Sequence, residues 1–267
     1  MDRTDIAIVV NSTPKYYYLL DAFFGLLRRY GEAIQWPVYF ATEHPNEPST
    51  KLLCKKYNIR ILELDIKEAD FLESRLAAVS ALPSQIKYVL PLQEDFLLER
   101  PGVDVKALTN ALEILDADDQ IQSIRLMPCP GSSAREGFWG IWKKLLNEDL
   151  QFSYQATIWR RGLYTEFMRG LVRQGHEQYP DLKGAEWNTY CVSINPAETF
   201  PGLQMLKTMA PSGVHLCWPR KGVWANAVYW CPWPYRPTAV VKGELQPWAV
   251  ELIRREGFIL MNSSNST

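Results

Sequence analysis

The sequence lacks any apolar run long enough to cross a membrane as a helix, which takes roughly 18 residues. Its N-terminus enters a short apolar stretch directly after charged residues, without the longer apolar region and cleavage site of a signal peptide. The net charge is only -1 at pH 7, so the chain also lacks the overall basic field of a nucleic-acid-binding protein. These absences predict a cytoplasmic protein with at most peripheral membrane contact and no nucleic-acid partner.

Cysteine is scarce and scattered. The five cysteines include no Cys-x-x-Cys pair, so the sequence predicts neither a disulfide framework nor a zinc site. The chain has 267 residues, of which 47% are hydrophobic. It can therefore bury a large core in one big domain or two small ones. We therefore expect an ordinary globular protein with reduced thiols.

Strands and helices alternate through the first part of the chain. The hydrophobic pattern predicts strands at 5–10, 37–41, 59–64 and 88–92, separated by helices at 16–30, 49–57 and 74–82. A helix at 105–115, strands at 122–127 and 153–161, and a helix at 162–173 follow. Alternation of this kind predicts a largely parallel sheet with helices on both faces.

The strand at 88–92 runs directly into two carboxylates, Glu94 and Asp95. Its nearly continuous hydrophobicity is typical of a strand covered on both faces, so the two acids fall where it leaves the sheet. Ligands of open α/β sheets bind at that carboxyl edge, where a carboxylate pair suits a metal, a phosphate-bound cation or a sugar hydroxyl. The alternative is that both acids only cap the next turn.

Two other segments bear on the same edge. Asn11 and Ser12 end the first strand, so we expect them beside Glu94 and Asp95. Arg75 falls in the first turn of the helix predicted at 74–82, where a cation opposes the helix dipole. It is therefore either a plain solvent-facing side chain, which these residues alone favour, or one held there to meet an anion.

The second half of the chain is rich in aromatic residues, since nine of its ten tryptophans follow residue 138. Aromatic faces stack well on sugar rings, but most tryptophans serve packing, so we expect only a minority to contact a ligand. The pattern predicts an irregular loop at 128–142, a packed coil at 211–237 and a last helix at 247–256. The coil could form a wall on the acceptor side of a site.

Two further carboxylates are candidates for a general base. Glu186 stands in the stretch 184–188, which predicts the start of a helix, and Asp181 precedes it in a loop. A carboxylate at a helix start usually stabilises the helix dipole, but either residue could instead remove a proton in a reaction.

Several segments, taken in order, resemble a family of bacterial and viral glycosyltransferases with a GT-A-like fold. They are Asn11-Ser12, Phe23-Phe24, Ser74-Arg75-Leu76, Gln93-Glu94-Asp95-Phe96, Gln155-Ala156-Thr157-Ile158-Trp159-Arg160, Glu186-Trp187 and the closing stretch 239–243. The resemblance runs from residue 5 to about residue 257. It implies one α/β domain at 1–257, with a Rossmann-like, mostly parallel central sheet flanked by helices, an aromatic-rich C-terminal region on the acceptor side, and a disordered polar tail at 258–267.

The resemblance also implies an activity. The enzyme would move a hexosyl or deoxyhexosyl group from a nucleotide-diphosphate sugar to a hydroxyl of a glycan or lipid-linked acceptor, in the synthesis of surface polysaccharide, lipopolysaccharide or glycoprotein glycans. Asn11 and Ser12 would touch the nucleotide, and Arg75 would face the diphosphate. Glu94 would belong to the donor site, and Asp95 corresponds to the aspartate that holds Mn²⁺ or Mg²⁺. The chain has Glu-Asp-Phe where the usual motif is Asp-x-Asp, which leaves metal dependence open.

On the acceptor side, the resemblance places Trp159, Arg160 and Trp187. If the sugar is inverted in one step, the acceptor hydroxyl must lose its proton, and Glu186 is the first candidate base with Asp181 second. Retention of the sugar configuration would need another arrangement.

Two other classes of function stay open. A glycoside hydrolase also uses paired acids, but it needs two carboxyl groups roughly 5 to 10 Å apart across the scissile bond. Glu94 and Asp95 are neighbours and would point in opposite directions on an extended chain, so they alone would make a poor pair. The third class is a non-catalytic module that binds a sugar or nucleotide.

Overall fold

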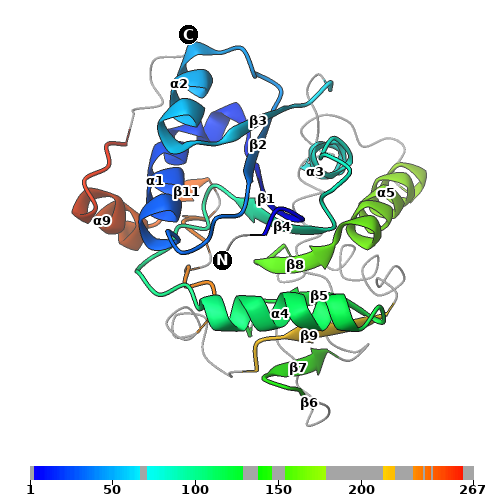
Figure 1. Cartoon of the computed structure of the whole chain (residues 1–267). Helices are drawn as coiled ribbons and strands as arrows, with labels where there is room; N and C mark the ends of the chain where they lie inside the picture. Colours follow the sequence, from blue (N-terminus) through cyan, green and yellow to red (C-terminus); the bar gives the residue numbers. More distant parts are fainter. Residues whose placement is uncertain are drawn as a thin grey trace.

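In the computed structural model, the described residues are 3–66, 71–128, 138–145, 154–178, 213–219, 231–236, 238–241 and 243–260. They form one large sheet of nine strands in the order β3-β2-β1-β4-β8-β5-β9-β7-β6, shown in Figure 1. The strands are β1 (Ile6–Asn11), β2 (Val38–Thr42), β3 (Arg60–Glu63), β4 (Tyr88–Gln93), β5 (Ile121–Arg125), β6 (Phe138–Trp139), β7 (Trp142–Leu145), β8 (Thr157–Arg160) and β9 (Val214–Cys217). A separate hairpin pairs β10 (Val240–Val241) with β11 (Glu244–Leu245).

Most strands of the large sheet run in one direction. β3, β2, β1 and β4 are parallel neighbours, and β5 and β9 are parallel to each other. Within the described part of the chain, only β8 and β7 run against the others. The prediction of an α/β fold with a mostly parallel sheet is therefore confirmed, and the predicted central strand lies inside the sheet between β1 and β8.

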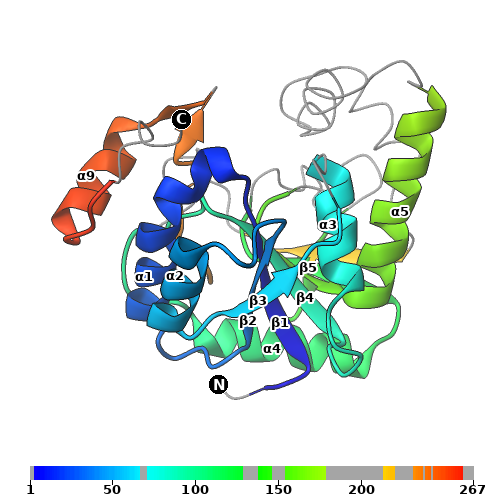
Figure 2. The same ribbon diagram turned by 90° about the horizontal axis from the view of Figure 1, so that it is seen from above.

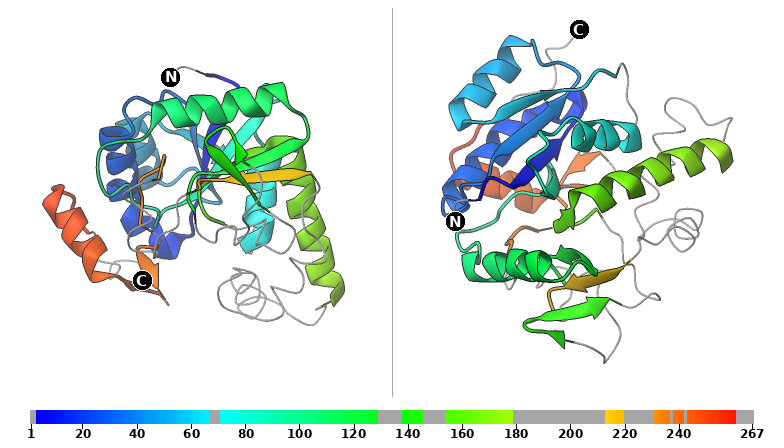
Figure 3. Two further views of the ribbon diagram at one scale, coloured as in Figure 1. Left: turned by 90° about the horizontal axis from the view of Figure 1, so that it is seen from below. Right: turned by 45° about the vertical axis from the view of Figure 1, so that its right-hand side comes forward.

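Helices cover both faces of the sheet (Figure 2). On one face lie α1 (Leu20–Tyr30), α2 (Pro48–Tyr57), α4 (Val105–Ala117) and α9 (Pro247–Arg255), and on the other lie α3 (Phe71–Ser80) and α5 (Arg161–Gln178). Helices α3 and α5 pack against each other, side by side in Figures 1 and 3. None of the described helices is long and apolar enough to cross a membrane. The cytoplasmic location and the single domain at 1–257 stay predictions.

The two-sided cover explains the hydrophobicity of the strands. In β1, Ile6, Ile8 and Val10 point into the core under α1, whereas Ala7 and Val9 point into the core under α3. Successive side chains of a strand alternate between its faces, so a strand covered on both sides must be apolar at every position. The first polar residue of β1 is Asn11, at its carboxyl end.

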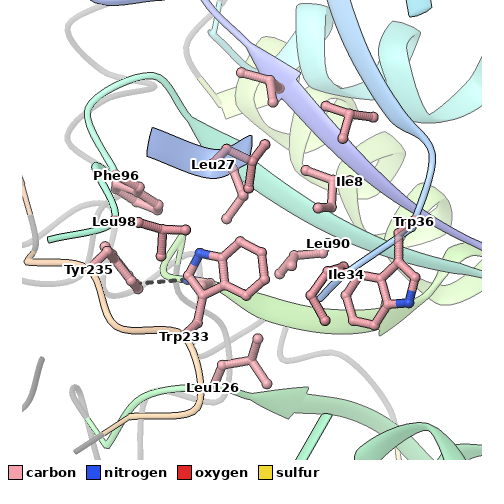
Figure 4. Packing of buried hydrophobic residues seen from close by; sticks show 14 of the residues in the cluster. Ile8, Leu27, Ile34, Trp36, Leu90, Phe96, Leu98, Leu126, Trp233 and Tyr235 are labelled. Atoms are coloured by element: carbon pink, nitrogen blue, oxygen red, sulfur yellow. Dashed lines mark hydrogen bonds between the residues drawn. The ribbon is translucent and has the colours of Figure 1, made fainter. Parts of the chain in front are cut away.

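A C-terminal stretch, residues 231–236 and 238–241, packs against the chain that follows β4; we call it the closing segment. Trp233 is fully buried and lies near Leu90, Leu98 and Leu126 in Figure 4. Tyr235 stacks on Phe96, with ring centroids 4.8 Å apart. These aromatic side chains therefore join the C-terminal region to the central sheet.

Several predicted boundaries were wrong. The stretch 211–237, expected to be a packed coil, contains strand β9, which pairs with β5 and β7 inside the sheet. The helix expected at 16–30 begins as a 3-10 helix, η1 (Pro14–Leu19), before α1. The described part of the loop expected at 128–142 contains β6 and the start of β7, joined by a turn in which Gly140 has a φ of +59°. A short strand such as β9 forms because it pairs with neighbouring strands of the sheet, and the local sequence pattern does not show that pairing.

Two tryptophans allow a test of the closing segment. Trp233→Ala should lower the free energy of unfolding by roughly 3–5 kcal/mol, because it empties a packed site in the core. Trp139 on β6 is 40% exposed, so Trp139→Ala should cost much less. Denaturant unfolding of both variants beside the wild type makes the comparison, and equal losses would show that Trp233 is not a core residue.

Candidate functional site

The carboxyl ends of β1 and β4 meet at one edge of the sheet. Asn11, the last residue of β1, is paired in register with Gln93, the last residue of β4. Glu94 and Asp95 follow in a turn that is closed by a hydrogen bond from Phe96 N to Gln93 O (3.1 Å). The structure thus brings Asn11 and Ser12 beside the two carboxylates, as the sequence predicted.

The two carboxylates are buried. Glu94 is 8% exposed and Asp95 is 9% exposed, although both follow directly after a strand end. Burial raises the pKa of Glu94 to about 8, and repulsion from Asp95 adds to this, while Arg75 and a hydrogen bond from Ser12 act against it. Burial also raises the pKa of Asp95. The pair is therefore placed where it resists carrying two negative charges.

Asp95 is held at one oxygen and unpartnered at the other. Thr238 Oγ1 donates a hydrogen bond to Asp95 Oδ2, and Ala239 N donates to the backbone oxygen of Asp95 (3.0 Å). Oδ1 is buried and has no hydrogen-bond partner among the described residues. A buried polar atom without a partner is costly, so Oδ1 is a candidate ligand for a cation or for a hydrogen-bond donor.

Arg75 lies in the interior, so the solvent-facing alternative was wrong. It is 7% exposed, because α3 begins at Phe71, earlier than predicted, and Arg75 falls in its second turn. The guanidinium lies over the rings of Phe71 and Tyr154, with its carbon 3.4 and 5.4 Å from the ring centroids, and Nη1 donates to Phe71 O (3.0 Å). Burial lowers the pKa of Arg75, whereas Glu94 and Asp95 act to raise it.

Two small cavities adjoin Arg75. Each has a volume of about 10 Å³, enough for roughly one water molecule. Gln93, Gln155 and Trp159 help to line one of them, and Asn11 helps to line the other. Asn11 Nδ2 also donates to Ser74 O (3.3 Å), which ties α3 to the end of β1. Arg75 and Asn11 thus line one small, largely apolar cavity next to the carboxylate edge.

The predicted acceptor residues do not all reach this edge. Trp159 is fully buried beside Arg75, with its ring centroid 5.8 Å from that of Tyr164. Arg160 pairs with Tyr88, at the other end of β4. Its guanidinium donates to the carbonyl oxygens of Ile121 (2.8 Å) and Asp118 (3.0 Å), far from the carboxylates along the strand. Glu186, Asp181 and Trp187 lie outside the described residues.

Sequence reasoning missed Thr238, described above, and two further residues of this edge. Arg125 ends β5, is 1% exposed, and lies at the same edge because β5 runs in the direction of β4. The second residue is Tyr235 of the closing segment. Its pKa is raised mainly by burial; the charge of Asp95 raises it further, and the charge of Arg125 lowers it. Arg125 could have been recognised as a charged residue at the end of an apolar strand. The strand was predicted at 122–127, which placed Arg125 inside it and not at its end.

The chain matches no known family profile and no curated protein sequence. Its structure is similar to 4-diphosphocytidyl-2C-methyl-D-erythritol synthase from Anaerococcus prevotii, at 10% identity and a TM-score of 0.45, covering 84% of this chain and 92% of that one. It is also similar to a 1–349 fragment of TarS from S. aureus, at 11% identity and a TM-score of 0.44, covering 82% of this chain and 59% of that one.

A third similar structure is glucosyl-3-phosphoglycerate synthase from Mycobacterium tuberculosis, solved with Mn²⁺ and UDP-glucose. The identity is 10% and the TM-score 0.38, covering 66% of this chain and 65% of that one. These values are low, so the function is argued below from the residues of this chain.

The raised pKa of Glu94 gives a stability prediction. The Glu94 carboxyl group binds its proton more tightly in the folded protein than in the unfolded chain. The wild type should therefore lose stability as the pH rises from about 4.5 to about 8. Glu94→Gln removes this loss, and its melting temperature should therefore rise relative to the wild type across that window. Thermal unfolding between pH 4 and 9 measures it.

The control is Glu63→Gln, which changes an exposed glutamate at the end of β3 and should follow the wild type at every pH. A Glu94→Gln curve parallel to the wild type would show that Glu94 is not held in a raised-pKa environment.

Proposed function

We propose that this protein is a glycosyltransferase that takes its sugar from a nucleotide-diphosphate donor, which binds at the edge formed by Asn11, Arg75 and Asp95. The observation that carries the proposal is the buried carboxylate pair, with one unpartnered oxygen, beside a buried arginine at the carboxyl edge of a mostly parallel sheet. Such an edge is where open α/β sheets bind nucleotides. The acceptor is a hydroxyl of a glycan or a lipid-linked sugar.

The chemistry needs positive charge at this place. As the glycosidic bond breaks, the leaving diphosphate gains negative charge, which a cation or a cationic side chain must stabilise. Arg75 supplies one permanent charge, and its two aromatic neighbours hold the guanidinium in place. Asn11 and Ser12, at the end of β1, are proposed to contact the nucleotide.

The site also fits a divalent cation. No group of three or more His, Cys, Asp or Glu side chains comes together in the described residues, but Asp95 and Glu94 form a pair. Mg²⁺ commonly binds through one or two carboxylates together with the phosphates of a substrate. A bound Mn²⁺ or Mg²⁺ would supply charge to the diphosphate, held by Asp95 Oδ1 with Glu94 beside it.

The base and the acceptor contacts are proposals on the family resemblance. Glu186 is the first candidate to take the acceptor proton and Asp181 the second. Trp187 is proposed to contact the acceptor, whereas Trp159 is fully buried and can only support the site from the interior. Arg160 is not part of this proposal, because its guanidinium donates hydrogen bonds to backbone oxygens at the opposite end of the strands.

The hydrolase alternative fits less well. Glu94 and Asp95 lie in a turn, not on an extended chain as expected, and they repel each other. Two carboxyl groups that share one environment do not flank a bond from opposite sides. A non-catalytic binding module would use the same site as the transferase, so only a measurement of turnover distinguishes these two hypotheses.

Asp95→Asn tests the proposal. The wild type should release nucleotide from at least one member of a panel of nucleotide sugars, and Mn²⁺ should increase the rate. The variant should lose roughly 10²- to 10³-fold of that rate, as when one electrostatic contact to a transition state is removed. Its melting temperature should not fall, because a buried charge is removed with little change in shape.

The control is Asp65→Asn, at an exposed aspartate after β3, which should keep full activity. Nucleotide binding without turnover in the wild type would favour the binding module. Equal losses of melting temperature and activity in Asp95→Asn would make Asp95 structural.

Glu186→Gln tests the proposed base. A positioned general base commonly contributes roughly 10²- to 10⁴-fold in rate, so turnover should fall by about that much while donor affinity stays nearly unchanged. Donor binding and turnover are measured on the same preparation. Near-normal turnover would pass the role to Asp181 or to a retaining mechanism.

A further inference from the structure

The closing segment is fixed to the chain around the carboxylates by backbone hydrogen bonds. Asp104 N donates to Pro232 O (2.9 Å), and Glu99 N donates to Pro234 O (3.0 Å). Ala239 N donates to the oxygen of Asp95 itself (3.0 Å). Figure 4 shows Trp233 and Tyr235 of this segment near Leu98 and Phe96. The segment therefore approaches Asp95 as a fixed element.

Thr238 is the residue of this segment whose side chain meets the Asp95 carboxylate. Its Oγ1 donates to Asp95 Oδ2 and lies 2.8 Å from Val240 O, while Val240 N donates to the same Oγ1 (3.3 Å). The hydroxyl has one proton, and a carboxylate is a stronger acceptor than the carbonyl oxygen of Val240. An ionised Asp95 therefore receives that proton in a charge-assisted hydrogen bond.

This contact distinguishes the two carboxylate oxygens. Oδ2 is occupied by Thr238, and Oδ1 has no partner among the described residues. We propose that Thr238 is a positioning residue, which fixes the rotation of the Asp95 carboxylate and leaves Oδ1 available to the donor or its cation. The inference rests on the proposed function, because it concerns how the same site binds.

The hydrogen bond also bears on the charge of Asp95. After burial, which raises the pKa of Asp95, the contact with Thr238 is the strongest influence and lowers it. The other charged or titratable groups that face Asp95 are Glu94 in the same turn, Arg75 of α3, Tyr18 of η1 and Tyr235 of the closing segment. The substitutions described below change none of these residues.

Two substitutions isolate the hydroxyl. Thr238→Val keeps the shape and removes the donor, whereas Thr238→Ser keeps the donor. The pKa of Asp95 is read by carbon NMR of protein labelled at the aspartate carboxyl carbons, with the signal assigned by its loss in Asp95→Asn. We expect a higher pKa of Asp95 in Thr238→Val than in the wild type, and a value close to the wild type in Thr238→Ser.

Donor hydrolysis is the second measurement. Thr238→Val should lose roughly 10- to 100-fold of the rate, the size of one hydrogen bond to a charged group. The loss should be greatest at low pH, because the acidic limb of the rate profile moves up with the pKa of Asp95. Thr238→Ser should recover most of the rate, which a purely structural role for the threonine would not require.

Thr165→Val is the matched control, since Thr165 is also half-buried and donates to a backbone oxygen, that of Arg161, on α5 (2.9 Å). It should leave the pKa of Asp95 and the hydrolysis rate unchanged. If Thr238→Val does not fold, Thr238→Ala against Thr238→Ser makes the same comparison. Equal hydrolysis rates with and without the hydroxyl, in Thr238→Val and Thr238→Ser, would overturn the inference. A wild type that hydrolyses no donor would instead overturn the proposed function, while the NMR comparison still decides whether Thr238 holds the carboxylate.

Discussion

Burial of two adjacent carboxylates at the end of β4 is the constraint around which this edge of the protein is arranged. Glu94 and Asp95 are both more than nine-tenths buried, so neither can be fully solvated by water when it is charged. Each added charge makes the other less favourable in such surroundings. The fold tolerates the pair because groups from other parts of the chain partly compensate it.

Those groups come from segments far apart in the sequence. Arg75 reaches the pair from α3, Ser12 from the end of β1, and Thr238 from the closing segment, 143 residues after Asp95. Helix α3 is held by packing against α5, and the closing segment by the stacking of Tyr235 on Phe96. The positions of these compensating groups therefore depend on packing across the core and not only on the turn that carries the acids.

Compensation of the two charges by the described residues is incomplete. Asp95 Oδ1 stays without a partner in the described part of the protein, and the pKa of both acids stays raised. A site that binds a cation or a charged donor gains most when the ligand relieves a cost that the free protein carries. We interpret the buried pair as stability given up for binding, as functional sites commonly show.

The sequence by itself determined the strands β1 to β5 and β8, the helices between them, and the edge at which Asn11, Ser12, Glu94 and Asp95 meet. The reason is local, because a strand apolar at every position must be covered on both faces, and its first polar residues must fall at its end. Tertiary structure alone decided that Arg75 is buried, that Arg160 belongs to the opposite edge, and that 214–217 is a strand. It also decided that Arg125 lies at the same end of the sheet as the carboxylates and that Thr238 contacts Asp95. Each of these depends on packing between segments distant in the chain, and neither the hydrophobic period nor the identity of neighbouring residues encodes such contacts.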